Sequence, residues 1–147
     1  MNKLFLADLK DMTENQIKEH IISNYSGQHD NYNGVYPDNP IAEDLVRDEL
    51  KHRNILIAYE SVGDYGCYSS SFFLFKDKKT KKFYEMHGSH CSCYGFEGQY
   101  EPEEITLENL KARIENAYKN QAFGSGGYDD ESTDNQKQVT EFIRNME

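Results

Sequence analysis

The segment His-Gly-Ser-His-Cys-Ser-Cys, residues 87–93, gathers the side chains of this chain that are best suited to chemistry. Two of the five histidines and two of the three cysteines fall inside it. Imidazole and thiolate groups are preferred zinc ligands, and a thiolate beside an imidazole can also act as a nucleophile. The segment therefore has three interpretations, which are a metal site, a catalytic thiol and a structural turn.

The metal hypothesis treats zinc as the one cofactor that the sequence suggests. Zinc takes four ligands at the corners of a tetrahedron. The spacing differs from that of the common zinc knuckle, because a single residue separates Cys91 from Cys93. The third cysteine can complete such a site only if the fold brings it to the segment. The candidate ligands are His87, His90, Cys91, Cys93 and Cys67.

The other two interpretations of this segment are catalysis and a plain turn. A cysteine nucleophile needs a lowered pKa and a neighbouring base, and no nucleophile signature in the chain singles out one cysteine–histidine pair. We therefore assign no catalytic residue and do not expect an enzyme. The simplest interpretation is structural, because a free cysteine packs as a small apolar residue and Gly88, Ser89 and Ser92 suit a close turn.

An acidic, tyrosine-containing region is the second candidate for function. The 147-residue chain has a formal net charge of -10, and ten acidic residues lie within 97–134. The five lysines of residues 76–82 form a short loop, not the broad basic face of a nucleic-acid binder, so we expect no direct nucleic-acid contact. We expect a basic protein partner instead. The candidate contact residues are Glu97, Tyr100, Glu101, Glu103, Glu104, Tyr128, Asp129, Asp130 and Glu131.

The elements that must position these residues follow from capping signals and hydrophobic periodicity. The motifs "TENQ" and "TDNQ" have the form of capping boxes, and "NP" favours a helix start. The chain predicts an α+β fold in one domain, 1–147, with a small three-stranded antiparallel sheet and helices before and after it (αα-βββ-αα), packed on one face. The expected helices are 13–24, 39–52, 106–118 and one from 133, and the expected strands are 54–62, 68–77 and 81–88.

Hydropathy and cysteine count indicate the compartment. The first apolar run is too short for a signal sequence, and no stretch reaches the length of a membrane span, so we expect no membrane partner. An odd number of cysteines favours reduced thiols or a metal over a disulfide framework. We therefore expect a cytoplasmic protein.

Three motifs together resemble a family of small uncharacterised proteins of tailed bacteriophages and prophages. They are "ESVGDYGCYSSSFFLF", "HGSHCSCYGFEGQYEPEE" and "FGSGGYDD", so the resemblance covers about residues 54–130. The family has no assigned activity, so it implies no residue roles. It does imply an accessory protein in the host cytoplasm, of a kind that often antagonises host defence or host nucleic-acid enzymes, as anti-CRISPR proteins do.

The expected function is therefore a binding protein that inhibits a host defence component or nucleic-acid enzyme through an acidic, tyrosine-rich surface. One alternative is a zinc-binding module, structural or hydrolytic, built on the histidines and cysteines. The other is a binder that sequesters a small ligand such as a signalling nucleotide. In that case tyrosines would stack on the base, and the lysines of residues 76–82 would meet the phosphates.

Overall fold

The computed structural model describes residues 3–27, 41–61, 69–90, 96–116 and 130–146. Within these ranges, one strand and two helices are followed by four consecutive strands and two further helices. Their order is β1 (Leu4–Ala7), α1 (Glu14–Tyr25), α2 (Glu43–Lys51), β2 (Arg53–Ser61), β3 (Ser69–Asp77), β4 (Phe83–His90), β5 (Glu103–Ile105), α3 (Leu107–Asn116) and α4 (Asp130–Arg144).

The sheet has five strands in the order β1-β2-β3-β4-β5. Strand β1 runs parallel to β2, and the remaining neighbours are antiparallel. The prediction of a three-stranded, fully antiparallel sheet was therefore wrong. The three long strands β2, β3 and β4 were expected, whereas the short edge strands β1 and β5 were not.

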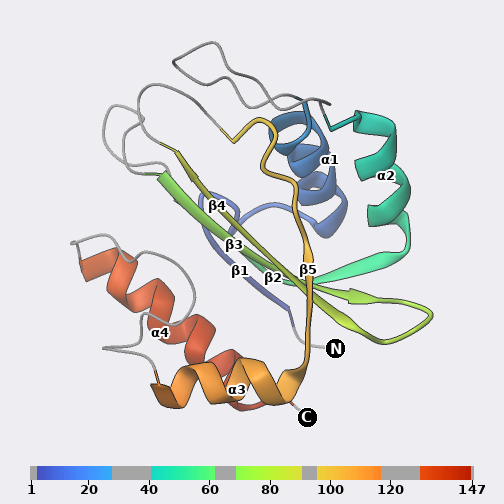
Figure 1. Cartoon of the computed structure of the whole chain (residues 1–147). Helices are drawn as coiled ribbons and strands as arrows, with labels where there is room; N and C mark the ends of the chain where they lie inside the picture. Colours follow the sequence, from blue (N-terminus) through green and yellow to red (C-terminus); the bar gives the residue numbers. More distant parts are fainter. Residues whose placement is uncertain (1–2, 28–40, 62–68, 91–95, 117–129, 147) are drawn as a thin grey trace, which may run out of the picture.

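Helices cover both faces of the sheet, with α1 and α2 on one side and α3 and α4 on the other (Figure 1). The expectation of helices on one face was also wrong. The reason lies in β3, where the consecutive residues 72–75, Phe-Phe-Leu-Phe, are all fully buried. Side chains alternate between faces along a strand, so an unbroken apolar run needs cover on both sides.

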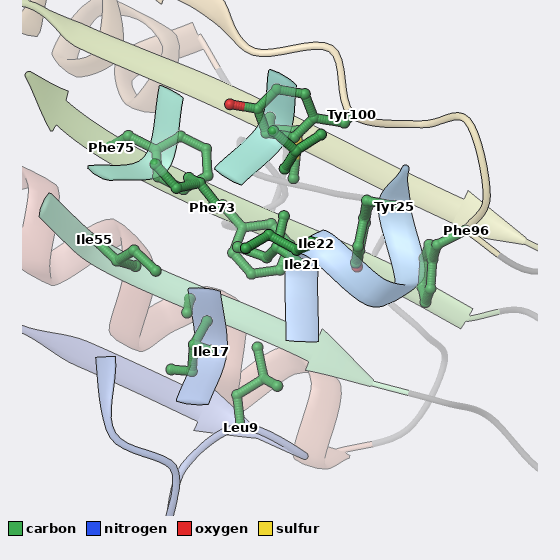
Figure 2. Close-up of a cluster of buried hydrophobic side chains, with 14 residues drawn as sticks. Leu9, Ile17, Ile21, Ile22, Tyr25, Ile55, Phe73, Phe75, Phe96 and Tyr100 are labelled. Carbon is green, nitrogen blue, oxygen red and sulfur yellow. The ribbon is translucent and has the colours of Figure 1, made fainter. Parts of the chain in front are cut away.

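The α1/α2 side holds the larger cluster of buried side chains. Figure 2 shows Ile17, Ile21 and Ile22 of α1 directed towards the sheet, where they pack with Ile55 and Phe73. The capping box that starts α1 is confirmed, because Gln16 N donates to Thr13 Oγ1 and Thr13 N donates to Gln16 Oε1. The isoleucines at helical spacing therefore face the core as predicted.

Helix α2 begins later than the Asn39–Pro40 signal suggested. Ile41 pairs through its backbone with Gly27, and the helix starts at Glu43 after Ala42 as N-cap. The extended pairing at Ile41 keeps that residue out of the helix. Val46 and Leu50 of this helix are buried, whereas Leu45 is 50% exposed.

The second core lies between the sheet and the pair α3/α4. Thr106 caps α3 as predicted, since Asn109 N donates to Thr106 Oγ1 at 3.0 Å. The expected stripe of α4, including Val139 and Ile143, is buried against Phe72 and Leu74 of β3. However, α4 starts at Asp130, so the second capping box falls inside the helix and does not begin it.

Candidate functional site

Residues 96–102, here called the strap, carry the acidic candidate surface towards β5. The strap crosses the α1/α2 side of the sheet and is attached to the end of α1 (Figure 1). Gly98 N donates to Ser26 O, and Tyr100 N donates to Tyr25 O, both at 3.1 Å. The Phe96 ring is buried and stacks on the Tyr25 ring with 4.8 Å between centroids (Figure 2).

A side-chain amide also ties the strap to the edge of the sheet. Ser89 N donates to Gln99 Oε1 at 2.9 Å, and Gln99 Nε2 donates to Ser89 O at 2.7 Å. Strand β5 pairs with β4 only at residues 83–85, so Gln99 supplies partners to β4 beyond the end of that pairing. Gly88 keeps room for this arrangement, because a Cβ there would lie 2.4 Å from Ser71 Oγ and 3.0 Å from the Phe96 ring.

Tyr100, one of the proposed contact residues, is only 4% exposed and belongs to the core. Its hydroxyl donates to Glu49 Oε1 at 3.0 Å and accepts from Arg53 Nη1 at 3.3 Å. Burial and the Glu49 carboxylate raise the pKa of Tyr100, so the phenol stays protonated. Tyr100 therefore anchors the strap and does not present its ring to a partner.

The four glutamates of the strap and β5 are all exposed, but they do not share one face. In β5, Glu104 lies opposite Tyr84 and Glu103 lies opposite Glu85. Neighbouring residues of a strand point to opposite faces, so Glu103 and Glu104 are directed apart. Glu104 accordingly pairs with Lys82 at 3.0 Å, whereas the charge of Glu103 acts on Arg113 of α3.

The later acidic candidates are not part of this surface. Tyr128 and Asp129 lie outside the described residues. Asp130 and Glu131 form the start of α4, which packs on the opposite face of the sheet from the strap. The acidic candidates that remain for this surface are thus Glu97 and Glu101 in the strap and Glu104 in β5, all of them exposed.

Two of the five metal candidates, both histidines, lie in β4. His87 lies in β4, and His90 is its last residue, whereas Cys67, Cys91 and Cys93 lie outside the described residues. Ser69, where the described chain resumes, lies opposite His90, where it stops. Among the described residues, no three histidine, cysteine or acidic side chains form a group that could hold a metal ion. The metal hypothesis stays a prediction.

The structure gives His87 a different partner. Its Nε2 lies 2.5 Å from Glu85 Oε1, and Arg113 of α3 holds both carboxylate oxygens of Glu85 at 2.7 Å. Burial alone would raise the pKa of Glu85, but the hydrogen bonds from His87 and Arg113 and the Arg113 charge lower it to about 2. This cluster connects β4 to α3.

A second buried carboxylate, Glu60 of β2, went unrecognised in the sequence. Tyr25 donates to Glu60 Oε1 at 2.5 Å, and His20 Nε2 lies 2.8 Å from Glu60 Oε2. The hydrogen bond to Glu60 raises the pKa of His20 against the opposing effect of burial. A signal was present, since Glu60 directly follows the apolar run 55–59 of β2 and a buried carboxylate needs partners.

The Glu60 cluster resembles an acid–base site in composition, and its imidazole, His20, is partly exposed. Asn24 Nδ2 lies 3.1 Å from His20 Nδ1, so both ring nitrogens of His20 already have partners. Burial and the adjacent Glu60 carboxylate raise the pKa of Tyr25 far above its usual value, so its phenol stays protonated and donates to Glu60. The arrangement therefore connects α1 to β2 through three side chains.

Comparisons with protein-family models, with curated proteins and with solved structures found no match for this chain. In the described part of the chain, no helix has both the length and the apolar composition needed to cross a membrane.

Proposed function

We propose that this chain is a binding protein of the phage accessory type that its sequence resembles. It engages a basic region of a host defence component or host nucleic-acid enzyme through the carboxylates of Glu97, Glu101 and Glu104. The observation that carries this proposal is local charge. Residues 96–110 contain five acidic residues and no basic residue, and all three of these glutamates are exposed.

The way in which the strap is held supports this function. Glu97 lies directly after the buried Phe96, and Glu101 directly after the buried Tyr100. A carboxylate on a fixed backbone loses less conformational entropy on binding than one on a flexible loop. The Gln99 pair with Ser89 adds a third attachment between them. The strap thus presents its acidic residues in a preorganised arrangement.

Glu104 has a partner that it must exchange when this surface binds. Glu104 pairs with Lys82, and both side chains are more than half exposed. Exposed ion pairs contribute about 0–1 kcal/mol, so a basic partner can replace Lys82 at small cost. Glu103 is left out of the surface because it is directed to the other face, and Tyr100 is left out because it is buried.

The test compares two triple variants of equal charge. Glu97→Gln/Glu101→Gln/Glu104→Gln removes the proposed surface, whereas Glu108→Gln/Glu115→Gln/Glu141→Gln removes three exposed carboxylates of α3 and α4. Each protein is used to capture binding proteins from a bacterial extract. Every captured protein is then purified, and its dissociation constant is measured by calorimetry at several salt concentrations. We expect only the first variant to lose binding and the salt dependence that accompanies it.

Two results would contradict the proposal. A purified partner that binds the strap variant and the wild-type protein equally tightly would show that the strap carboxylates are not the contact surface. Equal weakening by both variants would show that net charge alone governs association. Circular dichroism and the urea midpoint of each variant confirm that the fold is intact, because these side chains are exposed.

A further inference from the structure

A basic groove lies between α1, α2 and the tip of the β3–β4 hairpin. Its volume is about 470 Å³, within the range of small-molecule sites. Helix α1 contributes one face of successive turns, and α2 contributes its last turns. The lining residues are Asn15, Lys18, Glu19, Ile22, Arg47, Leu50, Lys51 and Lys78.

Four of these residues are cations and one is an anion, in a chain whose overall charge is strongly negative. Arg47 Nη1 pairs with Glu19 Oε1 at 2.5 Å, and Lys51 lies 3.6 Å from Asp48. Both pairs are on the surface, where such pairs are weak. Lys18 and Lys78 add two further positive charges from different elements, so the groove is a local basic site.

The backbone around Lys78 fixes its position at the groove. Lys78 N donates to His52 O at 2.8 Å, which attaches the hairpin tip to the end of α2. Asp77 Oδ1 accepts from Lys79 N and Thr80 N at 2.9 and 2.8 Å, so the turn itself is closed. The bond to His52 also occupies one of the carbonyl groups at the α2 C-terminus that would otherwise repel an anion.

We propose that this groove binds a small molecule carrying two or more linked phosphate groups, with Lys18, Lys51, Lys78 and Arg47 as its cationic contacts. The four cations come from three separate elements around a groove of about 470 Å³, and an oligophosphate chain carries several charged groups that can meet them together. Arg47 supplies the bidentate geometry that suits phosphate oxygens, and the lysines act as point charges. The two exposed ion pairs open at little cost when a stronger anion arrives.

The behaviour of Lys18 agrees with this site. Burial lowers the pKa of Lys18, the Glu14 carboxylate opposes that effect, and the charges of Lys78 and Lys3 lower it further. The like charges of Lys18 and Lys78 therefore repel each other across the groove. A bound oligophosphate would relieve this repulsion, which is a direct source of binding free energy.

The experiment measures binding of tripolyphosphate to the full chain by calorimetry and by thermal unfolding, at physiological ionic strength and without divalent metal. We expect saturable binding at one site and a rise in Tm. Lys18→Gln and Lys78→Gln should each weaken binding about tenfold or more. Lys79→Gln and Lys10→Gln remove the same charge from exposed positions outside the groove and should change the dissociation constant less than about twofold.

Each remaining outcome overturns the proposal. Absence of saturation at millimolar tripolyphosphate excludes the site, and equal weakening by Lys79→Gln and Lys78→Gln shows non-specific attraction. Citrate binding as tightly as tripolyphosphate would assign the groove to carboxylates, and tighter binding of a single-stranded oligonucleotide would assign it to nucleic acid. The strap variant Glu97→Gln/Glu101→Gln/Glu104→Gln should bind tripolyphosphate as the wild-type protein does, which separates this site from the proposed protein-binding surface.

Discussion

At the scale of single residues, the two buried carboxylates differ in the charge of their partners. Glu60 is held by the phenol of Tyr25 and the imidazole of His20, whereas Glu85 is held by the permanent cation Arg113 and by His87. A carboxylate beside a guanidinium stays ionised to low pH. The Glu85 cluster should therefore govern the response of stability to acid.

The lowered pKa of Glu85 predicts a loss of stability below about pH 4.5. The folded-state pKa of about 2 lies below the ordinary value of 4.5, so the stabilisation is complete above the ordinary value and disappears as pH falls through the folded-state value. With allowance for solvent around Arg113, its size is on the order of 2 kcal/mol. Urea unfolding between about pH 6 and 2.5 should show this loss in the wild-type protein and its absence in Glu85→Gln.

The matched control is Glu108→Gln, which removes an exposed carboxylate of α3. This variant should keep the acid dependence of the wild-type protein, because the Glu85–Arg113 pair is intact. If Glu85→Gln and the wild-type protein lose stability in parallel over this pH range, the carboxylate that titrates is a different one.

At the scale of elements, the start of α1 is joined to an irregularity in β2. The register between β2 and β3 shifts between Ile55 and Ile57. Ile55 N donates to Glu14 Oε1 at 2.6 Å, while Lys3 Nζ donates to Glu14 Oε2 at 2.7 Å. Next to this β-bulge, the first residue of α1 therefore accepts the hydrogen bond from the backbone N–H of Ile55, a buried donor that needs a partner.

Replacing Glu14 tests this connection between helix and strand. Glu14→Ala leaves the backbone N–H of a fully buried residue, Ile55, without its acceptor, and we expect a loss of about 1–3 kcal/mol in the free energy of unfolding. Lys3→Ala removes only the more exposed ion pair and should cost less than about 1 kcal/mol. Both variants are measured by urea unfolding. Equal losses would show that Glu14 stabilises the fold through its ion pair with Lys3 and not through its hydrogen bond from Ile55 N.

The elements that sequence patterns predicted are those with strong local signals. The capping box at Thr13, the cap at Thr106 and the periodic stripe of α4 depend on residues a few positions apart. Strands β1 and β5 have four and three residues and exist through pairing with distant partners, so no local period marks them. The helix start predicted at Thr133 was wrong, because α4 begins three residues earlier, at Asp130. Acidic residues such as Asp130 and Glu131 are favourable in the first turn of a helix.

In the candidate site too, sequence patterns predicted the features that depend on neighbouring residues but not those that depend on distant ones. The exposure of Glu97 and Glu101 agrees with a sequence rich in charge, but the opposite directions of Glu103 and Glu104 depend on the register of β5. The burial of Tyr100 depends on contacts with distant residues, namely Tyr25 of α1 and Glu49 of α2. The Glu60 and Glu85 clusters each join residues from separate elements, which sequence spacing cannot reveal.

At the scale of the whole molecule, the central strands belong to both cores at once. Phe73 packs with the α1/α2 side and Phe72 with the α3/α4 side, although they are adjacent in β3. Loss of packing on one face therefore removes support from the strand that the other face needs. The two helical layers should unfold together, as one cooperative unit.

This coupling predicts how truncation of one core affects the other. Phe72→Ala removes a fully buried ring from the α3/α4 side and should lower the free energy of unfolding by about 3–5 kcal/mol. In native-state hydrogen exchange, the most protected amides of α1, on the opposite face, should lose the same free energy as those of α4. Leu45→Ala, at a half-exposed position of α2, should change protection in either layer by less than about 0.5 kcal/mol. Loss of protection in α4 with α1 unchanged would instead show that the α3/α4 layer opens by itself. The basic groove and the strap, which both lie on the α1/α2 side, would then need only that half of the molecule to be folded.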